Sequence, residues 1–127
     1  MVCNDSPVLD IDLQTCSVKD LDFSNKFSLV ANRTDYIHAF VGWFEVYFSH
    51  GSQTIKLSTS MELKNTHWKQ SVFYIDDEIP IRKGEMIEGS ILAKKDKLNP
   101  RELNIKLSYR LGNEGYSSRN KRWRKYI

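Results

Sequence analysis

The sequence predicts an all-β fold, an antiparallel β-barrel or sandwich-like domain with at most one short helical turn. Apolar residues recur at every second position in several segments, the pattern of half-buried strands. Gly, Asn and Pro turns separate these segments, and helical periodicity is almost absent. The 127 residues are enough for one domain with its own core and too few for two. We therefore expect a single domain over residues 1–127.

The N-terminal segment predicts a strand followed by one turn of helix. Residues 8–13 alternate apolar and polar side chains directly after Pro7, as a first strand should. Ser17 is followed three residues later by Asp20, a spacing typical of a capping box.

Two further strands are expected on either side of a polar turn at residues 32–35. Residues 27–31 resume strand spacing before the turn, and residues 36–48 form the most apolar segment of the chain after it. A helix competes for residues 36–48, but their β-branched and aromatic side chains favour a central strand. Gly42 allows this strand to bend or bulge, so that it can serve two sheets or turn a barrel corner.

The second half of the chain predicts the remaining strands. A turn at residues 49–52 leads into a short strand, and Lys83 and Gly84 form a later turn. The acidic residues 76–78 read either as a solvated turn or as a patch that attracts cationic peptides. The strands are expected at residues 54–57, 70–75, 79–81, 87–94 and 103–111.

The net charge of +3 comes from the C-terminal end of the chain. Five of the 19 basic residues follow Ser118, and no acidic residue follows Glu114. Trp123 and Tyr126 lie among these basic residues, so the segment could bind nucleic acid through phosphate contacts and stacking. It could equally form the last strand of the domain, and we favour the strand.

Composition also restricts the environment of the chain. No apolar stretch approaches the roughly 18 residues of a membrane span, and the first residues are too polar for a signal peptide. Cys3 and Cys16 are far apart and form no metal-ligand motif, so we expect reduced thiols and no metal site. We expect an intracellular protein without a membrane contact.

His67 and Trp68 lie side by side where a loop enters the strand at residues 70–75. A histidine titrates near neutral pH, and an indole offers an electron-rich face to a guanidinium or ammonium group. The pair therefore suits a cation-binding wall. The alternatives are a loop histidine bonded to backbone and a tryptophan packed under the loop as an anchor.

Three segments of the chain resemble type I protein arginine methyltransferases. Residues 66–70, Thr-His-Trp-Lys-Gln, are similar to the family's Thr-His-Trp loop, and residues 35–44 to its long barrel strand. Residues 99–104 resemble its Asn-x-Arg-acid-Leu-Asn segment. The three occur in family order over most of the chain, and the resemblance implies the C-terminal β-barrel domain of these enzymes.

The resemblance implies a function in which His67 is catalytic, closing the active site and orienting glutamates of another domain. It assigns Trp68 and Thr66 to substrate binding, Trp68 as a wall for arginine and Thr66 mainly as a residue that shapes the loop. Met61 to Asn65 depart from the family, which has prolines and an aromatic residue here, so this loop should be less restrained.

The resemblance also implies S-adenosylmethionine as the cofactor of the full-length enzyme. The six glycines form no cluster that could cradle a nucleotide. The resemblance implies that the cofactor domain and the helical dimerisation arm precede this chain. The fragment is therefore expected to be inactive alone.

The implied partners are Arg/Gly-rich substrates such as histones and RNA-binding proteins, the N-terminal domain and a second enzyme subunit. The implied location is the cytoplasm, the nucleus or both. The rival hypothesis is a non-enzymatic β-barrel module whose basic C-terminal tail binds nucleic acid.

Overall fold

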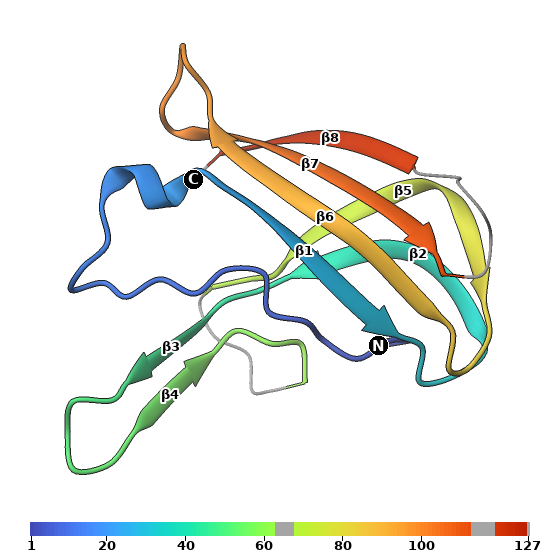
Figure 1. Cartoon of the computed structure of the whole chain (residues 1–127), viewed down its shortest axis with the longest axis horizontal. Coiled ribbons are helices and arrows are strands. Elements are labelled where there is room, and N and C mark those ends of the chain that lie inside the picture. The colour runs from blue at the N-terminus through green and yellow to red at the C-terminus, as the bar shows by residue number, and fades with distance from the viewer. Residues whose placement is uncertain (63–67, 113–118, 127) are drawn as a thin grey trace. The chain divides into compact units, whose positions relative to one another are not determined.

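A computed structural model describes residues 1–62 and 68–112 and the backbone of residues 119–126 (Figure 1). The chain divides into two compact units, Met1–Ile37 with Ile79–Ile127 and His38–Glu78. The first unit contains the larger sheet, and the second contains a small hairpin and the ends of two longer strands. The single domain expected from chain length stays a prediction.

The N-terminal segment contains the only helix among the described residues, the 3-10 helix η1 (Val18–Leu21). The carboxylate of Asp20 accepts a hydrogen bond from the Ser17 backbone N–H at 2.8 Å, so the predicted helical turn is confirmed. The strand predicted over residues 8–13 is wrong, because these residues have no ladder partner. The Val8 carbonyl accepts a hydrogen bond from the Asn25 amide, and Asp12 accepts hydrogen bonds from the backbone N–H groups of the turn that follows it.

Four antiparallel strands form the sheet of the first unit, in the order β1-β6-β7-β8. In chain order they are β1 (Phe23–Val30), β6 (Met86–Lys95), β7 (Glu102–Leu111) and β8 (Arg119–Tyr126). β6 and β7 are the two interior strands, since β6 pairs with β1 and β7, and β7 pairs with β6 and β8. The C-terminal segment is thus a strand, as we favoured.

Alternation along these strands explains which residues form the core of the first unit. Every second side chain of a strand points to the same face, so β7 buries Ile105, Leu107 and Tyr109 while their neighbours are more exposed. Each fully buried aliphatic side chain of this size contributes about 1.5–3 kcal/mol of transfer free energy. The other buried apolar residues of these four strands are Phe27, Ile87 and Ala93.

The turn before β6 contains the one glycine with a left-handed backbone among the described residues. Gly84 has φ of 87°, a conformation that side chains with a Cβ rarely adopt. Its N–H donates to the Ala31 carbonyl at 2.9 Å, and the Ala31 N–H donates to the Glu85 carbonyl at 2.9 Å. The predicted Lys83-Gly84 turn is confirmed.

The long apolar segment is two strands. β2 (Asp35–Gly42) ends at the glycine that was expected to bend it, and β3 (Glu45–Phe48) starts after Trp43 and Phe44. β2 pairs with β5 (Ser71–Ile81), and β3 pairs with β4 (Ile55–Ser58) as an antiparallel hairpin. The segment therefore serves two sheets, which is one of the two arrangements that the sequence left open.

β5 is longer than the sequence predicted. The acidic residues 76–78 lie inside this strand, so their interpretation as a turn is wrong. All three side chains are exposed, so their charges stay in contact with water inside the strand. Pro80 lies in the same strand and cannot donate a ladder hydrogen bond.

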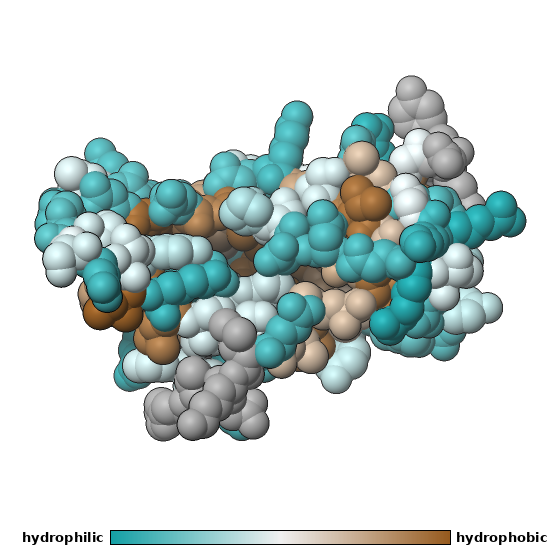
Figure 2. All heavy atoms as spheres, turned by 90° about the horizontal axis from the view of Figure 1, so that it is seen from below, coloured by the Kyte–Doolittle hydropathy of each residue, from teal (hydrophilic) through white to brown (hydrophobic). Residues whose placement is uncertain are grey.

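The fold class is confirmed as all-β with one short helical turn. The strands that the structure describes form three sheets and no closed barrel. Many apolar side chains stay partly exposed, and Figure 2 shows apolar surface in brown between hydrophilic side chains.

Candidate functional site

Trp68 is the one predicted site residue that the structure describes. Thr66 and His67 lie outside the described residues, together with residues 63–65 of the loop. Met61, at the start of this loop, lies in a turn with its side chain 55% exposed.

The indole of Trp68 is exposed and contacts one other aromatic ring. Its side chain is 53% exposed, and its ring meets that of Phe44 edge to face, with centroids 6.1 Å apart and an angle of 69° between planes. Such edge-to-face pairs are among the favoured aromatic arrangements. The structure therefore leaves part of the indole open to solvent, where a ligand can reach it.

Phe44 is held by Thr59, which is only 2% exposed. The Phe44 N–H donates to the Thr59 Oγ1 at 3.1 Å, and the hydroxyl donates to the Phe44 carbonyl at 2.9 Å. The Thr59 N–H also donates to that carbonyl, at 3.1 Å. Three hydrogen bonds thus fix the backbone on which the Phe44 ring is mounted.

Gln70 binds the same threonine from the other side of the loop. Its Nε2 donates to the Thr59 carbonyl at 2.6 Å. The β3–β4 ladder ends at the Glu45 and Ser58 pair, and the Phe44 N–H beyond it donates to the threonine hydroxyl.

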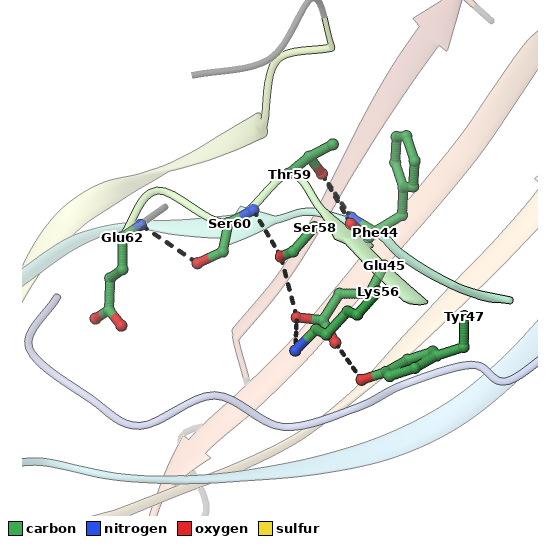
Figure 3. Close-up of polar contacts among 8 residues, drawn as sticks. All are labelled: Phe44, Glu45, Tyr47, Lys56, Ser58, Thr59, Ser60 and Glu62. Atoms are coloured by element: carbon green, nitrogen blue, oxygen red, sulfur yellow. Dashed lines mark hydrogen bonds and ion pairs between the residues drawn. The ribbon is translucent and has the colours of Figure 1, made fainter. Parts of the chain in front are cut away.

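A polar network covers one face of the β3–β4 hairpin, next to Phe44 in sequence (Figure 3). The carboxylate of Glu45 accepts hydrogen bonds from Lys56 Nζ at 3.0 Å, Tyr47 Oη at 2.8 Å and Ser58 Oγ at 3.1 Å. Lys56 Nζ also lies 5.6 Å from the centre of the Tyr47 ring. Glu45 therefore organises the whole face.

Hydrogen bonds continue from this network toward the loop. Ser58 Oγ accepts from the Ser60 N–H at 3.2 Å, and Ser60 Oγ accepts from the Glu62 N–H at 3.3 Å. The carboxylate of Glu62 points away from the network in Figure 3. The start of the loop is thus attached to the hairpin through two serine hydroxyls.

The network shifts the titration of its two charged members. The hydrogen bond from Lys56, followed by that from Tyr47, lowers the pKa of the Glu45 carboxyl from its ordinary value of 4.5. The hydrogen bond to Glu45 raises the pKa of Lys56 from 10.5. Both groups are therefore charged across the physiological pH range.

The sequence analysis missed this network and the Thr59 contacts. A usable signal was present, because Glu45 and Tyr47 are two residues apart on one strand, and Lys56 and Ser58 on the next. With the hairpin turn at residues 49–54, strand alternation places all four on one face. No comparable pattern marks Thr59 and Gln70.

The acidic part of β5 contacts a histidine. His38 Nε2 lies 3.8 Å from Glu78 Oε1, and both side chains are more than half exposed. His38 is therefore not part of the buried core. His50 is exposed near the hairpin turn.

An open depression of about 420 Å³ lies in the first unit beside η1. Four aspartates line it, and two of them accept hydrogen bonds from backbone N–H groups. Asp20 accepts from the Ser17 N–H, and Asp22 accepts from the Lys95 N–H at 2.9 Å. The four are Asp10, Asp12, Asp20 and Asp22.

The described residues contain neither a candidate metal site nor a candidate membrane-spanning helix. No cluster of three His, Cys, Asp or Glu side chains there is placed to hold a metal ion. No helix in the same residues is long and apolar enough to cross a membrane.

Comparisons with known proteins point to the same family as the three sequence segments. Residues 1–114 match the family model described as "Arginine methyltransferase oligomerization subdomain". The chain is 43% identical over 106 residues to protein arginine N-methyltransferase 1 of Schizosaccharomyces pombe, covering 84% of this chain and 31% of that protein. It is 40% identical over 114 residues to the Dictyostelium discoideum protein of the same name, covering 90% and 33%. The chain thus spans about a third of the length of these relatives.

Solved structures show the same fold. A chain of the Trypanosoma brucei PRMT1 enzyme-prozyme heterotetrameric complex with AdoHcy superimposes with a TM-score of 0.91 at 29% identity, covering 98% of this chain and 40% of that one. Arabidopsis thaliana protein arginine methyltransferase 10 gives 0.89 at 24% identity, covering 98% and 39%, which supports the fold alone. Together with the family match over residues 1–114, these likenesses show that the chain belongs to the protein arginine methyltransferases and corresponds to their C-terminal barrel-like domain.

Proposed function

We propose that this chain is the substrate-facing β domain of a protein arginine N-methyltransferase. The full-length enzyme would transfer the methyl group of S-adenosylmethionine to a guanidinium nitrogen of a protein arginine. The observation that carries the proposal is the family match over residues 1–114, with Trp68 of the Thr-His-Trp sequence exposed to solvent.

Trp68 is proposed as one wall for the substrate arginine. A guanidinium over an indole face gains about 0.5–1 kcal/mol when exposed and about 2 kcal/mol when desolvated. The exposed part of the Trp68 ring and its fixed edge-to-face contact with Phe44 support this role. Thr66 is proposed to shape the loop beside it.

His67 is proposed as a hydrogen-bonding orienter in the assembled active site. An imidazole can hold a carboxylate in place and can also accept a proton near neutral pH. The role rests on the family resemblance of residues 66–70, because His67 lies outside the described residues.

The described residues do not fit the cofactor. A nucleoside cradle needs a glycine-rich turn between a strand and a helix. The helix among the described residues is the four-residue η1, and no glycine precedes it. We propose that S-adenosylmethionine is bound by another part of the enzyme.

Calorimetry of these 127 residues with S-adenosylmethionine tests this division of labour. We expect no measurable heat of binding up to millimolar cofactor, and no methyl transfer to an Arg/Gly-rich peptide. The full-length enzyme, measured in parallel, should bind the cofactor and methylate the peptide. Tight binding by the 127 residues alone would refute the proposal.

Alanine substitutions in the full-length enzyme test the two site residues. We expect His67→Ala and Trp68→Ala each to lower kcat/KM by about tenfold or more, because each removes a group that contacts or orients the reacting partners. The unfolding temperature should change little, since Trp68 is half exposed. His50→Ala and Tyr36→Ala are matched controls at exposed positions, and they should keep wild-type turnover. Full activity in both site variants would exclude the assigned roles.

The proposed partners follow from the same function. They are Arg/Gly-rich protein substrates, including histones and RNA-binding proteins, the cofactor domain and a second enzyme subunit. The description of the matched family as an oligomerization subdomain supports association, and a homodimer of the full-length enzyme is our proposal. We also propose a location in the cytoplasm, the nucleus or both, where such substrates occur.

A further inference from the structure

The loop that carries Trp68 is closed at its base by one hydrogen bond. Gln70, two residues after Trp68, donates from Nε2 to the carbonyl of Thr59 at 2.6 Å. Thr59 precedes the loop by only a few residues and is buried. The bond therefore joins the segment entering the loop to the segment leaving it.

The same threonine also fixes the support of the aromatic pair. Its hydroxyl both accepts from the Phe44 N–H and donates to the Phe44 carbonyl, at 3.1 and 2.9 Å. The Phe44 ring then meets the Trp68 ring edge to face. Contacts thus run from Gln70 to Thr59, from Thr59 to Phe44 and from Phe44 to Trp68, and the chain returns from Trp68 to Gln70.

This closed path restricts both ends of the Trp68 side chain. The backbone near Trp68 is held through Gln70, and the indole ring is held through Phe44, while Thr59 connects the two. A half-exposed tryptophan without such contacts would sample several rotamers, and its ordering would cost binding free energy. A wall fixed before the substrate arrives avoids that cost.

We propose that Thr59, Gln70 and Phe44 are positioning residues that hold the Trp68 indole in one orientation for the substrate arginine. That the oriented indole binds the substrate arginine rests on the proposed function, whereas the orientation of the indole is a property of this chain alone. Two experiments therefore separate the two statements.

The first experiment measures the indole directly in the 127-residue chain. The three tryptophans are labelled as 5-fluorotryptophan, and their ¹⁹F resonances are assigned with single Trp→Phe variants. Thr59→Val removes the hydroxyl at nearly constant volume, and Gln70→Met removes the donor at nearly constant length. In each variant we expect the Trp68 resonance to move by more than its line width toward its position in the unfolded chain.

Matched controls lie in the exposed turn of the hairpin. Thr54→Val and Gln53→Met make the same chemical changes there and should leave the Trp68 resonance in place. Thr59→Ser keeps the hydroxyl and should restore the wild-type position. If Thr59→Val does not fold, Gln70→Met and Phe44→Leu decide the question. An unmoved Trp68 resonance in the folded variants would overturn the proposal.

The second experiment uses the full-length enzyme and separates KM from kcat. We expect Gln70→Met and Phe44→Leu to raise KM for an Arg/Gly-rich peptide by about five- to tenfold, since a mobile wall binds the peptide less well. KM for S-adenosylmethionine should stay within about twofold, which general damage to the fold would not allow.

The outcomes separate the inference from the function. If Trp68→Ala lowers activity and the positioning variants leave the peptide KM unchanged, the inference is wrong and the function stands. If Trp68→Ala has no effect while the ¹⁹F resonance moves in the variants, the orientation is confirmed and the proposed role of Trp68 fails.

Discussion

At the scale of single residues, Glu45 is the side chain on which the hairpin network depends. Three donors meet its carboxylate, and two of them, Tyr47 and Ser58, belong to neutral groups. Its neighbour Lys56 is largely solvated, so the ion pair by itself contributes little to folding. The network nevertheless has a structural role, because its hydrogen bonds connect the hairpin face to the serines at the start of the Trp68 loop.

Glu45→Gln should destabilise the chain in a pH-dependent way. The folded-state pKa of Glu45 is lowered, so its contribution exists above the ordinary value of 4.5 and is lost as the pH falls through the lower folded value. The pKa of Lys56 is raised, so its contribution exists below 10.5 and is lost as the pH rises beyond it. We expect wild type to unfold a few degrees higher than Glu45→Gln at pH 7, with the difference vanishing at strongly acidic pH and shrinking at strongly alkaline pH, where Lys56 loses its charge.

Thermal unfolding followed by circular dichroism across this range measures the effect. Glu62→Gln makes the same change on a carboxylate that points away from the network, and its difference from wild type should not follow this profile (Figure 3). A pH-independent difference for Glu45→Gln would contradict the assigned pKa direction.

At the scale of elements, β6 is organised around a close approach at Gly89. This glycine pairs with Phe27 on β1 and with Tyr109 on β7. A Cβ added there would lie 2.4 Å from the Ser108 carbonyl oxygen and 2.5 Å from Phe27 Cζ. The Phe27 ring occupies the space that a side chain at position 89 would need.

Gly89→Ala should therefore destabilise the first unit by about 1–3 kcal/mol or more, since overpacking forces the ring and the neighbouring strand to move. Urea unfolding gives the free energy. Gly51→Ala is the matched control, because the nearest atom to its Cβ is 3.7 Å away, an ordinary contact. We expect a change within about 0.5 kcal/mol there.

A double variant identifies the clash. Phe27→Leu removes the ring contact but leaves the Ser108 carbonyl, so it should recover part of the loss caused by Gly89→Ala. Strict additivity of the two substitutions would show that the ring is not the obstacle.

At the scale of the whole molecule, the basic C-terminal segment is the strand β8 and not a free tail. Its backbone pairs with β7 from Glu102 opposite Tyr126 to Tyr109 opposite Arg119. β7 carries the buried Ile105 and Leu107 of the sheet core. Loss of β8 would expose one complete edge of this strand, which favours pairing with other chains.

Truncation after Gly112 should lower the unfolding temperature and cause concentration-dependent association, seen by size-exclusion chromatography. The substitutions Lys121→Gln and Arg122→Gln reduce the charge while keeping the strand, and we expect them to preserve the elution volume. If the tail were a nucleic-acid site, the intact chain would bind RNA or DNA with an affinity that falls steeply with salt, and the two substitutions would weaken it. We expect no such binding.

Much of the fold was predictable because it depends on local patterns. Alternation placed the ends of β6 and β7 to within one residue. Gly84 marked a turn that requires positive φ, and Gly42 marked the point where the long apolar segment divides. Ser17 and Asp20 marked the helical turn. Each of these signals lies within a few residues of the structure that it predicts.

The sequence by itself determined the strand alternation, the turns and the Thr-His-Trp segment that indicates the family. Only the tertiary structure decided that residues 8–13 have no strand partner, that residues 76–78 continue β5, and that Thr59, Gln70 and Phe44 meet around Trp68. The physical reason is that hydrogen-bond partners and ring contacts between distant residues depend on how the chain is folded, and a local pattern does not specify them.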